Sequence, residues 1–564
     1  MNPAALSTDS IVTHQVPFSC KGSWFSFFRK NPGLAGGNAS APLSLRILAG
    51  TLWEAAEVVD IELEREGALI PWTENLRPEV LTLDAADGKG WVQIAFQDAA
   101  HARLRAEGVT LVLDSCRNVS RLGQNGWRVQ AGSQSWLLLA AVEGSLAIEK
   151  RGERWCLRLN GESQAAEVIV KRVATGGLTP VATGTFDQCV AGQRADLQAW
   201  HLAFPPAPVE FAALRERELN TLWNLTVGPL GNVRREVTLV SKGSLVGLWS
   251  WDHCWHMLGT ASVSPELAWN NLMSVFDHQD VTGALPDMFC ANQVCWGHVK
   301  PPVHGWMLGL LEEKAPWFND SHRREIYGPL AKFTGFWLHE CDEDGDGVPH
   351  YLHGCDSGWD NATVFDAGSP IETPDLSAWL VLQQEWLAKT ARRLGLDADA
   401  RRWEEGAKTL QGKLLEHFWT GHRFVARLSG THETVESESL LLRIPLILGN
   451  RLPVAARHWC LDGIRAGQRY RTDFGILSEP KDSPHFDPDG YWRGAMWPVT
   501  VFIFAEAFHV NGEMGEASSL ARSYLELIDR QGNFENYRGD TGKGVRDASI
   551  AWSATCALLL FTYV

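Results

Sequence analysis

The carboxy-terminal part of the chain, residues 206–564, carries apolar residues at helical spacing and never alternates strands with helices. For example, Ile326, Leu330, Phe333 and Trp337 are spaced so that they share one helix face. We read roughly a dozen helical segments of this kind. A closed ring of helical hairpins would bury them around one axis, and a smaller bundle is the alternative. In a ring, every second loop opens on the same rim, so residues distant in sequence can converge there.

The first 205 residues show a different pattern, with short runs of Val and Leu between turns such as Asn125-Gly126. The clearest strand candidates are 109–114, 135–140 and 166–171. Many short strands with regular turns are typical of a β-sandwich. Pro205-Pro206-Ala207-Pro208 forms a stiff connector, because proline fixes φ and disfavours helix before it. We therefore expect a mainly α protein, with an N-terminal β-sandwich domain at 1–205 and a helical domain at 206–564.

The charge balance disfavours some classes of partner. The chain has 51 Lys and Arg against 67 Asp and Glu, a net charge of −16. This disfavours nucleic acid and anionic membranes and suits a neutral ligand. No stretch is long and apolar enough to span a membrane, and residues 1–17 lack the features of a secretory signal. The 11 scattered cysteines favour a reduced, cytoplasmic setting.

The sequence also offers a candidate zinc site and an unusual number of tryptophans. Cys290, Cys295, His298 and His304 could be drawn as a zinc site, although their spacing fits no common zinc pattern. The 26 tryptophans are the compositional outlier. Most of them must fill the core, and the others are available to line a sugar-binding cleft.

Residues 355–361 bring carboxylates, an indole and a glycine together, with Asp360 directly after Gly358-Trp359. An indole can cover the apolar face of a sugar ring, and its low-dielectric surroundings raise the pKa of a neighbouring acid. Asp360 could equally be a loop aspartate that binds the backbone. Its competitors as an acid are Asp356, Glu372 and Asp375.

Four further loops combine aromatic and polar side chains. Trp251-Asp252 precedes a helix and is interpreted either as a core turn with a capping aspartate or as a sugar contact. Lys300 is either a solvated surface residue or a donor to sugar hydroxyls. The run 491–493 followed by Trp497 is either a cation–π knot or a wall of a sugar site. Glu535 would be unremarkable alone.

An acidic loop matches the first half of a calcium loop. Its residues at positions 1, 3, 5, 6 and 7 are Asp342, Asp344, Asp346, Gly347 and Val348, the last through its carbonyl. Position 12 is His353 rather than a bidentate glutamate, so a ligand from elsewhere would be required. A polar loop without an ion is the alternative. We expect bound calcium in a structural role.

Several of these stretches together resemble the motifs of one enzyme family. The motifs are Ser357-Gly358-Trp359-Asp360-Asn361, Tyr491-Trp492-Arg493-Gly494, Phe534-Glu535-Asn536-Tyr537 and Ser549-Ile550-Ala551-Trp552-Ser553-Ala554. They resemble glycoside hydrolase family 63, which includes processing α-glucosidase I and bacterial α-glucosidases. Glucosylglycerate and mannosylglycerate hydrolases are relatives, and the trehalases of family 37 are more distant. The resemblance covers residues 249–554 and implies an (α/α)6 barrel, an N-terminal β-sandwich and inversion of anomeric configuration.

The resemblance also implies roles for individual residues. By motif, Asp360 matches the general acid and Glu535 the general base. The positions that match the lining of the sugar site are Trp251, Asp252, Lys300, Gly358, Tyr491, Trp492, Arg493 and Trp497. Trp359 joins them as the indole beside the acid, and the acidic loop resembles a calcium loop of some bacterial members. Ala362-Thr363 and Arg538-Gly539 depart from the family pattern, which bears on the substrate more than on the chemistry.

We therefore expect an inverting, exo-acting hydrolase of α-glucosidic bonds in a small sugar or oligosaccharide, with no redox cofactor. An α-glucoside phosphorylase, a mannosylglycerate or glucosylglycerate hydrolase, and a carbohydrate-binding pseudoenzyme are alternatives. A sugar isomerase is another, and it would need catalytic histidines. The histidines available for that role are His253, His256 and His304. The oligomeric state stays open.

Overall fold

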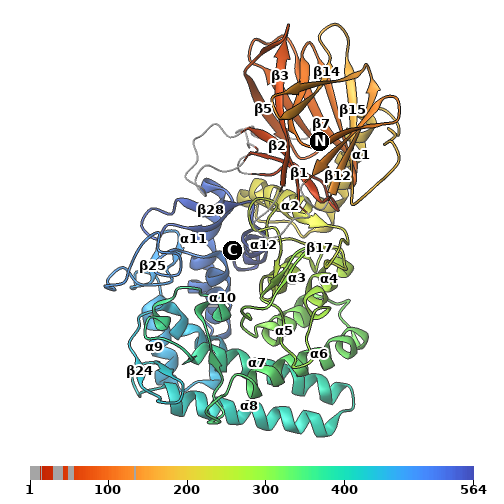
Figure 1. The fold of residues 1–564 in the computed structure, drawn as a ribbon. Coiled ribbons are helices and arrows are strands. Elements are labelled where there is room, and N and C mark those ends of the chain that lie inside the picture. The colour runs from red at the N-terminus through yellow and green to blue at the C-terminus, as the bar shows by residue number, and fades with distance from the viewer. Residues whose placement is uncertain (1–12, 14–15, 30–41, 49–55, 132–134) are drawn as a thin grey trace.

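The computed structural model describes residues 13, 16–29, 42–48, 56–131 and 135–564. Most of residues 1–17, from which we expect no secretory signal, lies outside these ranges. The described chain has a β-rich part above a ring of helices (Figure 1). Within these ranges, no helix combines the length and the apolar character that crossing a bilayer requires.

The β-rich part consists of two antiparallel sheets. One has the order β1-β2-β3-β9-β14-β13, with β4 beside β3, and the other has the order β10-β11-β12-β15-β8-β7-β6-β5. The strands are β1 Phe25–Arg29, β2 Leu43–Ile47, β3 Ala56–Arg65, β4 Ala68–Leu69, β5 Trp72–Arg77, β6 Val80–Ala85, β7 Trp91–Asp98, β8 His101–Glu107, β9 Thr110–Cys116, β10 Val119–Leu122, β11 Gly126–Ala131, β12 Ser135–Glu143, β13 Leu146–Arg151, β14 Arg154–Asn160 and β15 Ala166–Val173. The three clearest strand candidates of the sequence correspond to β9, β12 and β15.

One prediction for this part is wrong. Residues 186–203 do not continue the strands but form helix α1 (Phe186–Ala203), which packs on β7 and on α2 (Ala212–Leu225). A capping box starts α1. The Thr185 side chain accepts from the backbone N–H of Gln188, and the Gln188 side chain accepts from the backbone N–H of Thr185. That Thr-x-x-Gln signal was readable in the sequence. Pro205–Pro208, the predicted connector, lies between α1 and the short 3₁₀ helix η2 (Val209–Phe211).

The remaining helices of the described chain form two concentric layers. Their bounds are α3 Asp252–Thr260, α4 Pro265–Phe276, α5 His304–Lys314, α6 Asp320–His339, α7 Pro374–Arg393, α8 Asp397–Phe418, η5 Leu440–Arg451, α9 Val454–Ile464, α10 Pro498–Val510, α11 Met514–Gln531 and α12 Ala551–Leu560. The inner helices contact one another in the order α3, α5, α7, η5, α10, α12 and back to α3. Outside them, α2 packs on α12, α4 on α3, α6 and α8 on α7, α9 on η5, and α11 on α10. This is an (α/α)6 barrel, as expected.

The sequence pattern explains which helices lie in which layer. The inner helix α10 is buried from Pro498 to Phe508 because it is apolar on nearly every side. The outer helix α6 buries one face, on which the side chains of Ile326, Leu330, Phe333 and Trp337 are all fully covered. Ser264 caps α4 by accepting from the backbone of Leu267, and a proline follows at the first helical position, as the sequence indicated.

The loops that precede the inner helices hold only short elements. These are β16 Thr226–Val227, β17 Val237–Thr238, β18 Leu248–Trp249, β19 Met288–Phe289, β20 Val294–Cys295, β21 His350–Tyr351, η3 Gly354–Ser357, η4 Thr363–Phe365, β22 Ile371–Glu372, β23 Ala426–Leu428, β24 Thr434–Val435, β25 Arg471–Thr472, β26 Gly475–Ile476, β27 Phe534–Tyr537 and β28 Gly544–Ala548, with η6 Phe561–Tyr563 ending the chain. Because the inner helices run in the same direction, these loops open on one rim. Asp360 and Glu535 lie in two of them.

Closure of the ring depends on a close approach of α12 to α3. A Cβ added at Gly259 in α3 would lie 2.3 Å from Thr555 Cγ2 in α12, a distance that requires the helices to move apart. We expect Gly259→Ala to lower the free energy of unfolding by about 1–3 kcal/mol through overpacking. Thermal or urea unfolding followed by circular dichroism measures this loss.

Gly309 in α5 provides the matched control, because a Cβ there would have no neighbour within 4 Å. Gly309→Ala should be neutral or slightly stabilising, since alanine is the better helix former. Equal stability losses in the two variants would contradict the close approach of α12 to α3.

Candidate active site

The loop that carries Asp360 is shaped by a glycine beneath an indole. Gly358 has φ of +75°, and a Cβ at this position would lie 2.6 Å from the ring of Trp251. Only glycine fits both the left-handed backbone and this close approach. The structure thus places two predicted site residues, Gly358 and Trp251, in contact, and it shows that Gly358 acts through its lack of a side chain.

Asp360 lies near a buried ion pair of Lys300 and Asp287. Lys300 Nζ is 3.1 Å from Asp287 Oδ1 and donates to the carbonyl oxygen of Cys355 at 2.6 Å. Burial raises the pKa of Asp360, the charge of Lys300 opposes that rise, and Asp287 adds to it. The net effect is a pKa of Asp360 above its ordinary value, which is the direction that a general acid needs. The structure buries Lys300, so the alternative of a solvated surface residue is wrong.

The three competitors of Asp360 for the role of acid are each engaged in hydrogen bonds to other groups. Asp356 accepts from the backbone N–H groups of Val299, Leu352 and His353, so it holds the loop together. Asp375 accepts from the hydroxyl of Tyr351 at 3.0 Å in the core. Glu372 is bound to His417 Nε2 at 2.6 Å, beside the acidic loop. These three carboxylates stabilise the local structure through their hydrogen bonds. Asp360 is partly exposed and is therefore the candidate acid.

Glu535 lies on β27, which pairs with β28, and the register shifts at this residue. Such a β-bulge re-aims a side chain. Tyr491 donates from its hydroxyl to Glu535 Oε1 at 2.9 Å. Burial raises the pKa of Glu535 to about 7, and the bond from Tyr491 works in the opposite direction. Burial raises the pKa of Tyr491, and the charges of Glu535 and Asp360 add to this rise.

Asp252 belongs to the same electrostatic cluster. It is the first residue of α3 and is buried, and its N-cap is Trp251. Burial raises the pKa of Asp252, Lys300 opposes the rise, and Glu535 adds to it. The interpretation of Asp252 as a capping residue is therefore wrong by one position. Its carboxyl joins Lys300, Asp360 and Glu535 at the rim.

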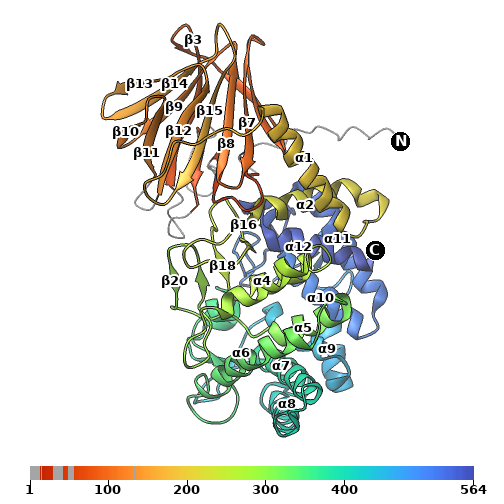
Figure 2. The ribbon, with the colours of Figure 1, turned by 90° about the vertical axis from the view of Figure 1, so that its right-hand side faces the viewer.

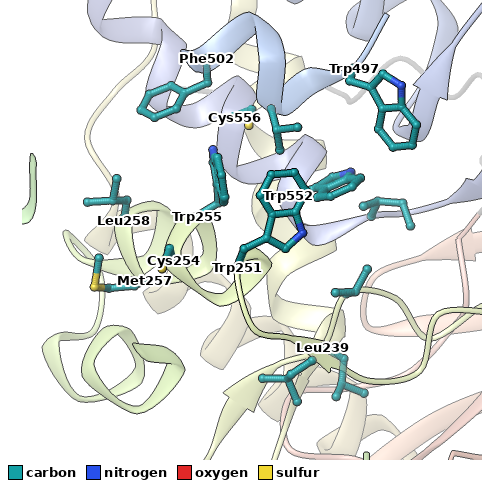
Figure 3. Packing of buried hydrophobic residues seen from close by; sticks show 14 of the residues in the cluster. Leu239, Trp251, Cys254, Trp255, Met257, Leu258, Trp497, Phe502, Trp552 and Cys556 are labelled. Carbon is teal, nitrogen blue, oxygen red and sulfur yellow. The ribbon is translucent and has the colours of Figure 1, made fainter. Parts of the chain in front are cut away.

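The predicted tryptophans form one packed wall. The indoles of Trp492 and Trp497 are stacked at 4.0 Å, and Trp359 lies 4.5 Å from Trp492. Trp552 links Trp497 to Trp251 through edge-on contacts. Figure 3 shows Trp251 and Trp552 next to each other. Trp359 and Trp492 are each 1% exposed, and Trp497 is 0% exposed. The expectation that these three rings contact a sugar therefore does not hold in this arrangement. The effect of Trp359 is to exclude water beside Asp360.

Arg493 connects two of the rim loops. Its Nε donates to the carbonyl of Asn361 at 2.9 Å, and its guanidinium pairs with Asp366. Asn361 completes the connection, because it accepts from Trp492 N–H at 2.9 Å and donates to the Gly490 carbonyl at 3.0 Å. These bonds fix the loop of Asp360 against the loop of Tyr491.

Sequence reasoning missed two carboxylates of the site, Asp287 and Asp547. Neither stands in a recognisable motif, and their importance comes from distant partners. Asp287 pairs with Lys300, whereas the charge of Asp547 raises the pKa of Glu535. Only the assembled rim brings these groups together.

The histidines that an isomerase would need are core residues. His253, His256 and His304 are fully buried, and burial lowers the pKa of each. Candidate metal ligands of the described chain place His298 beside His353 and Cys355, and His304 beside His253 and Cys254. The set of Cys290, Cys295, His298 and His304 drawn from the sequence is therefore not brought together.

The acidic loop folds as a cation loop would. Asp342 accepts from Gly347 N–H at 3.0 Å, and Asp344 and Asp346 each accept from the backbone two residues ahead, the latter from Val348 at 2.7 Å. Hard oxygen ligands suit calcium. Buried oxygens without a hydrogen-bond partner belong to Asp342 and to Glu372.

Glu372 is a candidate for the ligand that the acidic loop requires from elsewhere. A carboxylate oxygen of Glu372 lies within 4.8 Å of ligand atoms of Asp344, Asp346 and His432. His353, at position 12, instead caps the helix η3. The carboxylate oxygens are donors that suit a calcium ion, and the imidazoles of His432 and His417 lie among them.

Comparisons with known proteins agree with this architecture. Residues 246–553 match the family model of the mannosylglycerate hydrolase MGH1-like glycoside hydrolase domain. A mannosylglycerate hydrolase of Thermus thermophilus is 24% identical over 410 residues, which are 58% of this chain and 97% of that protein. A glucosylglycerate hydrolase of Mycolicibacterium hassiacum is 23% identical over 408 residues, 55% of this chain and 91% of that protein.

Solved structures show the same fold. The family 63 mannosylglycerate hydrolase of Thermus thermophilus, bound to Tris and D-glycerate, superimposes with a TM-score of 0.55 at 22% identity and covers 62% of this chain and 100% of that chain. A bacterial glucoamylase in complex with acarbose reaches a TM-score of 0.64 at 10% identity and covers 100% of this chain and 95% of that chain. The family model spans more than half of the sequence, and the chain therefore belongs to the MGH1-like glycoside hydrolases of family 63.

Proposed function

We propose that this glycoside hydrolase is an inverting, exo-acting enzyme with Asp360 as general acid and Glu535 as general base. The observation that supports this most is that two carboxylates from distant loops meet in one electrostatic cluster, since Tyr491 donates its hydroxyl to Glu535 and the charges of Glu535 and Asp360 both raise the pKa of this tyrosine. Burial raises the pKa of both groups, as acid–base catalysis near neutral pH requires.

The proposed reaction follows from these positions. Asp360 gives its proton to the glycosidic oxygen as the bond from that oxygen to the anomeric carbon breaks. Glu535 takes a proton from a water molecule whose oxygen attacks the opposite face of the same carbon. The sugar leaves with inverted configuration and the leaving group as an alcohol. An inverting pair keeps its carboxyl groups about 6.5–9.5 Å apart, to make room for that water.

The substrate we propose is a small α-glycoside of glucose or mannose. The α-glucosidic bond is the expectation from the motifs. The relatives named mannosylglycerate and glucosylglycerate hydrolases favour a hexose linked to a small acid such as glycerate. These two hexosylglycerates are therefore the first substrates to test, together with α-linked glucose disaccharides.

The acid and base assignments are tested by proton NMR of the products. We expect the wild type to release the β-anomer first from an α-glycoside, without phosphate. Asp360→Asn and Glu535→Gln should each lower kcat by about 10²–10⁴-fold, because each removes a proton-transfer group. Glu404→Gln changes an exposed carboxylate on the outer helix α8 and should retain full activity.

Other outcomes would contradict the proposal in distinct ways. First release of the α-anomer would rule out inversion. Turnover only after phosphate is added would identify a phosphorylase. An inactive wild type across the whole panel, with saturable sugar binding, would identify a pseudoenzyme.

The pH profile tests the state of the base. Glu535 must be ionised, and its pKa is raised to about 7, so kcat/KM should fall as the pH drops through about 7. The hydroxyl of Tyr491 lowers this pKa by binding the carboxylate. Tyr491→Phe should therefore raise the pKa of Glu535 and move the acid limb to higher pH.

Tyr327 offers the matched control, because its hydroxyl donates to Asp399 at 3.0 Å between the outer helices. Tyr327→Phe should leave the pH profile in place. An acid limb that stays fixed in Tyr491→Phe would show that Glu535 does not set it.

We also propose that the acidic loop binds calcium in a structural role, with Glu372 as the ligand from outside the loop. Calcium at about 100 times its dissociation constant should stabilise the wild type by about 2.7 kcal/mol. In protein first stripped with a chelator, calcium should therefore raise the Tm of the wild type. Glu372→Gln should abolish this rise. His353→Gln, at position 12 of the loop, should retain it. A calcium response that survives Glu372→Gln but not His353→Gln would overturn the proposed ligand set.

A further inference from the structure

The β-bulge that carries Glu535 on β27 lies against Asp547 on the paired strand β28. The backbone N–H of Asp547 donates to the carboxylate of Glu535, and the charge of Asp547 raises the pKa of Glu535. Asp547 lies on β28 between Arg546 and Ser549, two non-glycine residues with positive φ. This strained strand keeps its shape only if its surroundings hold it. The position of Asp547 therefore determines where Glu535 points.

The carboxylate of Asp547 is held by the loop at 241–245. Asp547 Oδ2 accepts from the Ser241 hydroxyl at 2.6 Å, from Ser244 N–H at 2.9 Å and from Leu245 N–H at 3.2 Å. Within the described residues, no Lys or Arg forms a salt bridge with Asp547. A Cβ at Gly243 would lie 2.5 Å from Asp547 Oδ1. The loop thus fits closely around a buried carboxylate that neutral donors stabilise.

The same loop is held from its other side by the N-terminal part of the chain. Arg46 on β2 donates from Nη1 to the Gly243 carbonyl at 3.0 Å. Lys242 lies in the loop itself and reaches back to the N-terminal part. Its Nζ donates to Ser19 Oγ at 3.0 Å and to the Cys20 carbonyl at 3.4 Å. Lys242 is fully buried, and burial lowers its pKa to about 7. A buried amine without these acceptors would be costly.

Further bonds join the two parts at this place. Gly22 N–H donates to the Thr226 carbonyl at 2.8 Å, and Gly228 N–H donates to the Gly22 carbonyl at 3.0 Å. Trp24 Nε1 donates to the Gly228 carbonyl at 2.7 Å. Figure 2 shows β16 directly beneath the sheets, where this junction lies. These hydrogen bonds form a seam between the N-terminal part and the barrel. A displacement of the N-terminal part would therefore shift the barrel loops that are bonded to it.

We infer that the N-terminal β part positions the general base, through Arg46 and Lys242, the loop at 241–245 and Asp547. Arg46, Lys242 and Asp547 are positioning residues, because they act on the reaction through Glu535. The inference rests on the proposed role of Glu535 as base. It assigns a catalytic purpose to a part of the chain that lies outside residues 246–553, which match the family model.

Three variants of the full-length protein test the inference. Arg46→Met and Lys242→Met remove the donors and keep most of the side-chain volume, and Gly243→Ala pushes on Asp547 from the loop. We expect each to lower kcat by about tenfold or more, with a small change in KM.

The acid limb of kcat/KM should move to lower pH in the same variants. The groups that face Glu535 are Tyr491, Asp547, Arg546 and Asp252. When Asp547 recedes and water enters, burial and the charge of Asp547, which raise the pKa of Glu535, both weaken. The bond from the backbone N–H of Asp547, which lowers this pKa, weakens too, but burial is the largest cause, so the net shift is downward. A merely structural role would lower Tm and leave this limb in place.

Arg65→Met is the matched control. Arg65 also donates to a backbone carbonyl, that of Gly108 at 3.1 Å, but inside the β part. It should retain the wild-type kcat and pH profile. If Arg46→Met or Lys242→Met loses its near-ultraviolet dichroism, Ser19→Ala decides the question, because it removes only one acceptor of Lys242 and should give a smaller shift of the same sign.

Two failures are distinguishable. Full activity in Glu535→Gln would overturn the proposed function itself. An inactive Glu535→Gln, together with wild-type kcat and acid limb in folded Arg46→Met, Lys242→Met and Gly243→Ala, would overturn the positioning inference alone.

Discussion

The site depends first on the closure of the inner ring, where α12 returns to pack on α3. Gly259 permits this contact because its lack of a side chain leaves space for Thr555. The loop that leads into α12 carries Glu535, and the first residue of α3 is Asp252. Closure therefore brings together two carboxylates from opposite ends of the barrel sequence, and the charge of Glu535 raises the pKa of Asp252. An open bundle of the same helices would leave them apart.

Burial is also the source of the chemistry at the rim. The stacked indoles of Trp492 and Trp497 and the covered ring of Trp359 exclude water from one side of the site. Exclusion of water disfavours a charged carboxylate. The charge of Lys300 lowers the pKa of Asp360, but Asp287 pairs with this lysine and acts in the opposite direction. Burial is the largest cause, and the pKa of Asp360 is therefore raised above its ordinary value.

The sequence was sufficient where local patterns decide the structure. The face of α6 and the cap of α4 at Ser264 follow from periodicity and capping. The family resemblance supplied the (α/α)6 barrel and the proposal of Asp360 and Glu535 as the catalytic pair. The failures were of two kinds. Helix α1 was missed because the strands before it set the expectation, although its capping box was present. Asp287 and Asp547 could not be found, since each matters through a partner far away in sequence, and no spacing encodes such a pairing.

The N-terminal part belongs to the catalytic unit for a physical reason. Lys242 stands on the barrel side of the seam, yet its amine has its acceptors, Ser19 and Cys20, on the other side. Without that side, the loop at 241–245 would expose a buried amine and the carbonyl of Gly243 would lose its donor. The loop would rearrange to hydrate them, and Asp547 would lose its three donors. By this argument a barrel of this sequence depends on the N-terminal part to keep Glu535, the proposed base, in place.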